Sequence, residues 1–152
     1  MYSSNREKQI KFTKSKLKSD GIIGFIEKFS NTDANEFFKR EQIKDIYFKR
    51  RFFSEEDIFL KKKNVLSDMN NGLVTLEQFI DALSKFFAYA VINWNSGNFY
   101  TLYASNNKNN LLNFLSYMPS SLIPDKYVHI ELPTALLTLN KSEIKYRTIK
   151  EN

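Results

Sequence analysis

Apolar residues recur at helical spacing through most of the first 90 residues. We expect a short buried helix over 21–30, GIIGFIEKFS, because its apolar positions fit one broad helical face. These positions are Ile22, Ile23, Phe25, Ile26 and Phe29. The segment that follows Thr75 has the broadest apolar stripe of the chain and is expected to form the central core helix. That stripe consists of Phe79, Ala82, Leu83, Phe86, Phe87 and Ala90.

Helix starts are marked by a capping residue followed three places later by an acidic or amide residue. In chain order these pairs are Ser4–Glu7, Asp33–Glu36, Ser54–Asp57 and Thr75–Gln78. Each pair predicts that a helix begins directly after its first residue. Residues 1–19 form either a first helix or a frayed basic arm, because Phe12 does not share a face with Ile10 and Leu17.

The pattern changes after Asn93. NWNSGNFYTLYAS, residues 93–105, has the turn signal Ser96–Gly97 between two β-favouring runs, and 127–132 and 143–150 alternate between apolar and polar residues. A short helix is expected over 111–118, before Pro119. The fold class is therefore α+β: a mostly helical N-terminal two-thirds, with a small antiparallel sheet from the C-terminal third.

Length and composition indicate one globular domain over residues 1–152. The chain has 152 residues, and 42% of them are hydrophobic, enough for a single core but too few residues for two ordinary domains. It has no cysteine, which excludes disulfides and thiolate chemistry. We expect a cytoplasmic protein, because the start of the chain is polar and no apolar run reaches the roughly 18–20 residues of a membrane span.

Positive charge is concentrated in the first part of the chain. The net charge is +6, and residues 1–63 contain 16 Lys and Arg against 10 Asp and Glu, whereas the remainder is balanced at 7 against 7. Lys11, Lys14 and Lys18 are at helical spacing and would line one side of a first helix. Such asymmetry favours an acidic partner, which can be a protein or a nucleic acid.

The segment SDMNNGLVTLEQF, residues 67–79, resembles part of a calcium-binding EF-hand loop. Gly72, Val74 and Phe79 match its turn glycine, its hydrophobic position and the first apolar residue of its exit helix. The ligand positions do not match, because they hold Ser67, Met69, Asn71 and Gln78 where calcium needs a cage of charged oxygens. We therefore expect no metal site, and a helix that begins after Thr75.

No motif for catalysis or for a cofactor is present. The four glycines, at 21, 24, 72 and 97, are too dispersed for a phosphate-binding loop. His129 is the single histidine, so a multi-histidine metal site is excluded. Glu55, Glu56 and Asp57 fall in the first turn of a predicted helix, where carboxylates stabilise the positive end of the helix dipole. We expect no cofactor and no enzymatic activity.

Residues 37–53 interleave aromatic and basic side chains. The aromatic ones are Phe37, Phe38, Tyr47, Phe48, Phe52 and Phe53. On a helix these rings spread over about half of the circumference, which favours a core helix that contacts two neighbours. The alternative is a binding surface, because base stacking and phosphate pairing use the same residue types.

The sequence favours a non-enzymatic protein-binding module, such as a small inhibitor, immunity or anti-defence protein, that blocks an acidic surface of its partner. Tyr, Phe and Arg are enriched at the centres of protein interfaces. The alternative is a nucleic-acid-binding protein that uses the basic residues 1–63. In either case the expected partner-binding residues are Lys11, Lys14, Lys18, Lys39, Arg40, Lys49, Arg50 and Arg51.

Overall fold

The fold is α+β, as the sequence predicts, with most helices in the N-terminal part of the chain. A computed structural model describes residues 5–119, 134–140 and 143–145. For the last two segments it describes the backbone path alone. The strand predicted over 127–132 and the residues after 145 lie outside the described residues.

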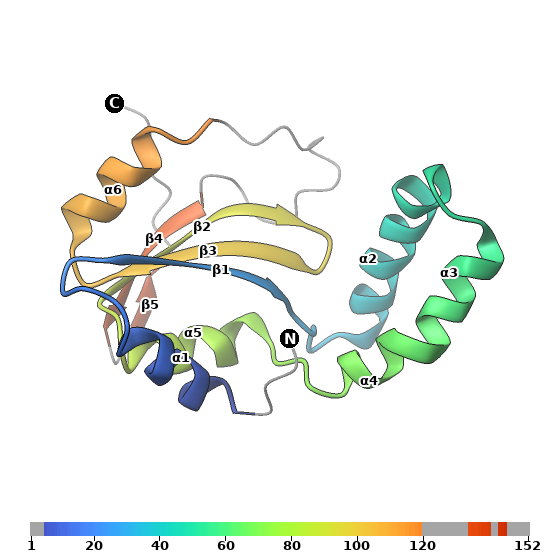
Figure 1. The fold of residues 1–152 in the computed structure, drawn as a ribbon, viewed down its shortest axis with the longest axis horizontal. Helices are drawn as coiled ribbons and strands as arrows, with labels where there is room; N and C mark the ends of the chain where they lie inside the picture. The colour runs from blue at the N-terminus through green and yellow to red at the C-terminus, as the bar shows by residue number, and fades with distance from the viewer. Residues whose placement is uncertain (1–4, 120–133, 141–142, 146–152) are drawn as a thin grey trace.

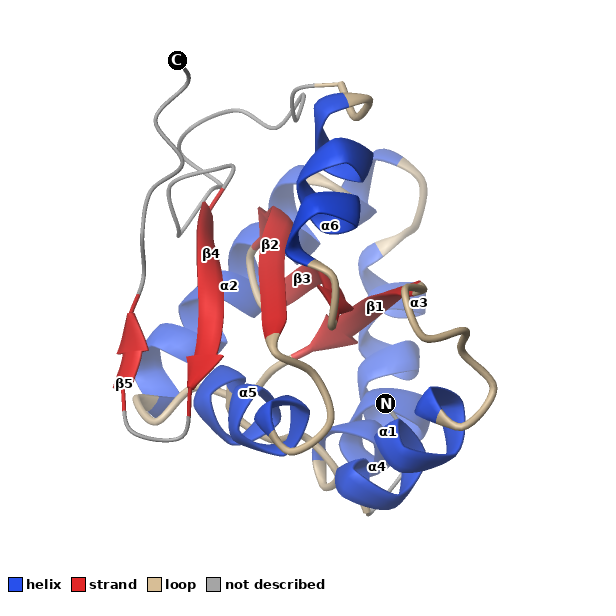
Figure 2. Cartoon of the chain, turned by 90° about the vertical axis from the view of Figure 1, so that its left-hand side faces the viewer, coloured by secondary structure: helices blue, strands red, loops and turns tan. Residues whose placement is uncertain are grey.

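Within the described residues, five antiparallel strands form one sheet in the order β1-β3-β2-β4-β5. Figure 2 shows this order, with β1 at one edge and β5 at the other. β1 pairs with β3 from Ile22↔Ser105 to Lys28↔Phe99, so the first strand of the chain joins the sheet through a partner about half the chain away. The strand bounds are Ile22–Lys28 for β1, Tyr89–Ser96 for β2, Phe99–Ser105 for β3, Thr134–Asn140 for β4 and Glu143–Lys145 for β5.

The segment predicted as a buried helix over 21–30 is strand β1, so that prediction is wrong. Ile23 and Phe25 pack against the hydrophobic core, whereas Ile26 is exposed. Gly24 lies under the Tyr103 ring of β3, where an added Cβ would come within 2.9 Å of a ring carbon. The apolar residues therefore lie on both faces of a strand, and their combined spacing along the sequence resembles that of a helix.

The β-hairpin predicted around Ser96–Gly97 is confirmed. β2 and β3 pair from Tyr89↔Ser105 to Ser96↔Phe99, with an irregularity between Ile92 and Trp94. Gly97 has φ of 60°, a left-handed conformation that a glycine adopts at no steric cost.

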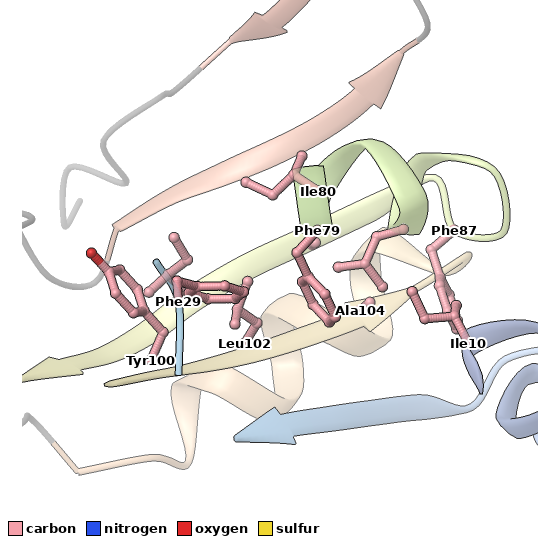
Figure 3. Close-up of a cluster of buried hydrophobic side chains, with 11 residues drawn as sticks. Ile10, Phe29, Phe79, Ile80, Phe87, Tyr100, Leu102 and Ala104 are labelled. Atoms are coloured by element: carbon pink, nitrogen blue, oxygen red, sulfur yellow. The ribbon is translucent and has the colours of Figure 1, made fainter. Parts of the chain in front are cut away.

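The hydrophobic core lies between one face of the sheet and the helices α1 and α5. In Figure 1 these two helices lie below the sheet, and α6 lies on its opposite face. Figure 3 shows core side chains from α1, α5, β2 and β3 meeting in one row. Phe79 is central, because its ring contacts those of Phe25 and Phe29 at centroid distances of 5.3 and 5.4 Å.

In the part of the chain that the structure describes, three helices pack on the sheet, and each begins at a side-chain cap. Asn5 caps the first helix by accepting from the Lys8 amide, and Asn107 caps the last by accepting from Asn110. Thr75 and Gln78 form the predicted reciprocal capping box, with bonds of 2.9 and 3.2 Å. The bounds are Arg6–Lys14 for α1, Leu76–Ser84 for α5 and Lys108–Ser116 for α6. The core helix therefore ends before Phe86, and Ala90 belongs to β2.

Residues 34–70 form a helical hairpin that projects beyond the end of the sheet (Figure 1). One arm is α2 with a 3-10 turn, η1, and the other is α3, which continues through a π-helical segment, η2, into α4. The bounds are Ala34–Tyr47 for α2, Lys49–Arg51 for η1, Glu55–Lys61 for α3, Lys62–Leu66 for η2 and Ser67–Asn70 for α4. Asp33 caps α2, and Ser54 with Asp57 forms the predicted capping box on α3.

The helical hairpin contributes nothing to the hydrophobic core cluster of the described residues. That cluster draws its members from α1, β1, β2, β3, α5 and the segments beside them. Ile58 and Met69, which are buried within the helical hairpin, lie outside it. The two ends of the hairpin leave the body at one point, since the Ser30 amide donates to the Val74 carbonyl at 2.9 Å. The helical hairpin is thus an insertion between β1 and α5.

Candidate interaction surface

Lys28, the last residue of β1, is buried beneath the helical hairpin, with 1% of its side chain exposed. Its Nζ donates to the Glu41 carboxylate of α2 at 3.1 Å and to the Asn70 side-chain oxygen of α4 at 3.0 Å. The same atom lies 5.3 Å from the centre of the Phe37 ring and 5.9 Å from that of Phe99. A buried ammonium is costly unless its charge and its hydrogens find partners, so these contacts tie both arms of the hairpin to the sheet.

Glu41 is the acceptor at the centre of this polar anchor. Besides Lys28 it pairs with Lys44, and it accepts from the Asn98 side chain at 2.9 Å. Asn98 also donates to the Phe37 carbonyl at 3.1 Å, which joins the β2–β3 turn to α2. Burial on its own raises the pKa of the Glu41 carboxyl. The charges of Lys44 and Lys28 and the hydrogen bonds from Lys44 and Asn98 outweigh burial and hold that pKa below its usual value.

Asp45, one turn further along α2, joins the two arms of the hairpin. Its carboxylate lies 2.7 Å from the Lys49 ammonium of η1 and 2.5 Å from the Lys62 ammonium of η2. Burial raises the pKa of Asp45, but hydrogen bonds and charge from Lys49 and Lys62 hold it below its usual value. Lys62 is the first residue of the π-helical segment, so this segment supplies one of the two cations that pair with Asp45.

The helical hairpin has an inverted distribution of side chains. α2 buries the carboxylates Glu41 and Asp45, whereas a surface helix ordinarily buries apolar residues. Of the 11 large hydrophobic side chains that are exposed in the described residues, eight lie in the helical hairpin, and this concentration is typical of an interaction surface. The eight are Phe38, Ile46, Tyr47, Phe52, Phe53, Phe59, Leu60 and Val65.

The tip of the helical hairpin presents rings and cations together. Arg50, Arg51, Phe52 and Phe53 are consecutive and all exposed. They are held in place by the 3-10 turn on one side and by the Ser54 capping box on the other. Side chains on such a fixed turn lose less conformational entropy on binding than those on a flexible loop.

Among the predicted binding residues of the hairpin, the structure separates exposed from internally paired ones. Lys39, Arg50 and Arg51 are exposed, although Arg50 lies 2.7 Å from Glu55. Arg40 is mostly covered, because it donates to Glu36 at 2.8 Å and to the Tyr100 hydroxyl at 3.2 Å. Lys49 is also mostly covered in its pair with Asp45. Arg40 and Lys49 therefore hold the hairpin together and present little of their charge to a partner.

Lys11, Lys14 and Lys18 do not line one helix, contrary to the prediction from their spacing. α1 ends at Lys14, and Lys18 lies in the turn before β1. Lys11 and Lys18 are exposed, whereas the Lys14 ammonium lies 4.9 Å from the centre of the buried Phe87 ring. The two exposed lysines belong to the body of the molecule and not to the helical hairpin.

The expectation that the rings of residues 37–53 are core is wrong for most of them. Phe37 and Phe48 are half-buried, and the other four rings are exposed. Polar side chains occupy the positions that face the sheet, as Arg40 does toward Tyr100. The buried side chains of α2 are the carboxylates Glu41 and Asp45, which are held by ion pairs, and four of the six rings stay outside.

Sequence reasoning missed the exposed side chains of α3 and η2 as candidate binding residues. They lie in FLKKKNVL, residues 59–66, which has three lysines and no acid. The signal available in the sequence was the absence of any acidic residue from this stretch. It stands out because the preceding turn holds three acids in a row.

The segment that resembles an EF-hand loop does not form such a loop. Ser67–Asn70 is the helix α4, and Gly72 follows in a turn. Within the part of the chain that the structure describes, no group of three or more His, Asp or Glu side chains is arranged to hold a metal ion. No helix in that part is both long and apolar enough to cross a membrane.

Comparison with protein-family models, with curated proteins and with solved structures finds no match to the chain. The case for a function therefore depends on the residues themselves.

Proposed function

We propose that the chain is a non-enzymatic protein-binding module that blocks an acidic surface of its partner through the helical hairpin. Small inhibitor, immunity and anti-defence proteins work in this way. The observation that carries the proposal is the inverted hairpin, with Glu41 and Asp45 inside and apolar side chains outside. Removing exposed apolar area of this kind from water lowers the free energy and so favours binding of a partner.

A protein is a better partner for this surface than a nucleic acid. Ile46, Leu60 and Val65 are exposed aliphatic side chains, which offer neither a ring for base stacking nor a charge for phosphate. After Phe52, Phe53 and Ser54, the tip cations are followed by three exposed acids, Glu55, Glu56 and Asp57. A polyanion would meet repulsion there, whereas a protein surface accommodates both signs of charge.

The experiment uses the 152-residue chain, immobilised, with an extract of its native host. We expect one protein to be retained in constant ratio to the bait, before and after treatment of the extract with nuclease. Retention that disappears with nuclease would contradict the proposal. So would direct binding to oligonucleotides with a steep loss of affinity as salt rises, which is the mark of phosphate-driven binding.

Two matched variants connect the capture to the helical hairpin. Phe52→Ser with Phe59→Ser removes rings that are 80% and 63% exposed, and Phe12→Ser with Tyr117→Ser removes rings outside the hairpin that are 66% and 81% exposed. We expect the first pair to abolish capture and the second pair to retain it. Equal loss with both pairs would show that general surface hydrophobicity, and not the helical hairpin, causes the capture.

A further inference from the structure

The outer face of α2 carries a row of two apolar side chains and one amide that points away from the sheet. Phe38, Gln42 and Ile46 are four residues apart and exposed. Arg40 and Lys44 mark the sheet side, because Arg40 donates to Tyr100 and the Lys44 ammonium lies 5.3 Å from the centre of the Phe99 ring. At 100° per residue, the row is centred about 180° around the helix from these two cations. The sheet therefore leaves this row uncovered.

The outer row of α2 is itself uncharged, and the nearest exposed cation lies beside it. Lys39, beside the row, is exposed, with its ammonium 3.8 Å from Glu36. The same combination recurs on the other arm. There Phe59, Leu60 and Val65 are exposed together with Lys61 and Lys63. Each arm of the hairpin thus offers apolar side chains flanked by lysines.

We propose that the helical hairpin binds an amphipathic helix of a partner protein, with an apolar stripe and acidic flanks, as a third helix across its outer faces. The inference rests on the proposed function and names the partner's chemistry. An amphipathic helix binds by packing its apolar stripe, ridges into grooves, against exposed apolar side chains such as those on these two arms. The charge complement of Lys39, Lys61 and Lys63 is a row of Asp or Glu beside the partner's apolar stripe.

The first test uses three synthetic peptides of about 20 residues, a length that supports a helix once it is bound. One has Leu on one face and Glu on the others, one has Lys in place of Glu, and one has the composition of the first with its Leu positions scrambled. Fluorescence anisotropy measures binding to the 152-residue chain. We expect the acidic amphipathic peptide to bind at least about tenfold more tightly than the other two, a difference of about 1.4 kcal/mol. Equal binding of the acidic and scrambled peptides overturns the inference.

The second test exchanges the charges of the hairpin. Lys61→Glu with Lys63→Glu is expected to reverse the preference, so that the basic amphipathic peptide binds more tightly than the acidic one. Lys8→Glu with Lys108→Glu changes the net charge equally at exposed lysines outside the hairpin, and is expected to keep the original preference. Reversal by the second pair would assign the effect to net charge and would contradict the docking site.

The third test removes the apolar contacts. Phe38→Ser with Phe59→Ser deletes one exposed ring from each arm, at 65% and 63% exposure. This double variant is expected to weaken binding of the acidic peptide by at least about tenfold and to leave the melting temperature unchanged.

Failure of this inference differs from failure of the proposed function. If the chain captures a host protein after nuclease treatment but shows no preference among the peptides, the proposed function stands and the acidic helix as partner is ruled out. If an oligonucleotide binds tightly at these residues and no protein is captured, both proposals are ruled out.

Discussion

Lys28 determines how the helical hairpin sits on the sheet. It is the one position where a β1 side chain contacts α2, α4 and two aromatic rings among the described residues. Its ammonium is removed from water, and the compensation comes from the Glu41 carboxylate and the Asn70 oxygen. Removing one member of such a pair leaves the other partly uncompensated, which is more costly than replacing both.

Lys28→Met is therefore expected to lower the free energy of unfolding by about 2–4 kcal/mol. The loss is smaller than that of leaving a buried charge without any partner, because Glu41 still contacts Lys44 and Asn98. Lys39→Met is the matched control. Its ammonium lies 3.8 Å from Glu36 at the surface, and its loss is expected to change stability by less than about 0.5 kcal/mol. Urea unfolding measures both. Equal stability of the two variants would show that the polar anchor contributes nothing to holding the hairpin.

The buried carboxylates Glu41 and Asp45 predict how the stability of the fold depends on pH. Folding lowers the pKa of Glu41 and Asp45 below their ordinary values of 4.5 and 3.8. In this range the unfolded chain binds more protons than the folded one, so stability rises with pH. The contribution is complete above these ordinary values and is lost as the pH falls through the lower, folded values.

We expect the free energy of unfolding to decline as the pH drops below about 4.5, with a smaller decline in Glu41→Gln with Asp45→Asn. Measurement of urea midpoints from pH 7 to pH 3 gives both curves. The double variant is expected to be less stable at pH 7 and to approach the parent at pH 3. Parallel curves would assign the acid sensitivity to other carboxylates.

Elements that depend on neighbouring residues were predictable from the sequence, and elements that depend on distant ones were not. Asp33, the Ser54–Asp57 pair and the Thr75–Gln78 pair mark true helix starts, because a cap is a contact within three residues. β1 was predicted as a helix, since its pairing with β3 is a long-range contact that no local pattern encodes.

The proposed binding surface was recognised in part. The basic and aromatic residues of 37–53 were a candidate surface, but their spacing favoured a core helix. What separates the alternatives is that Glu41 and Asp45 face inward, and this depends on Lys28 and Lys62 approaching from other elements. Burial of a carboxylate is decided by such partners and cannot be inferred from helical spacing.

The helical hairpin is expected to be dispensable for the fold of the body. Its ends meet where Ser30 bonds Val74, and the core cluster includes none of its side chains. We expect that a chain with residues 32–73 replaced by two glycines still shows a cooperative thermal melting transition and keeps the circular dichroism signal of the sheet. By contrast, Phe79→Ala in the core is expected to lower the free energy of unfolding by about 3–5 kcal/mol. A shortened chain without a cooperative transition would show that the hairpin and the body fold as one unit.

At the scale of the whole molecule, the positive charge lies on two separate parts of the structure. Lys11 and Lys18 are exposed on the body, and Arg50 and Arg51 are exposed at the tip of the helical hairpin. Charges away from a contact surface act mainly on the rate of association and on its salt dependence. The lysines of the body are thus expected to attract an acidic partner toward a surface formed elsewhere.

Replacing Lys11, Lys14 and Lys18 by Gln should slow association with the captured partner several-fold at low salt and leave the dissociation rate nearly unchanged. The melting temperature should also change little, because two of the three side chains are exposed. Stopped-flow or surface-based kinetics at two salt concentrations measures the effect. A large increase in the dissociation rate would place these lysines inside the contact surface.

The central claim is that the partner covers the helical hairpin, and amide hydrogen exchange with and without the captured partner tests it most directly. We expect slower exchange to be concentrated in residues 34–70, greatest in α2 and in α3 with η2, and little change in α1, α6 and the sheet. Protection concentrated on α1 or on the exposed edge of β1, with the helical hairpin exchanging as in the free protein, would contradict the claim.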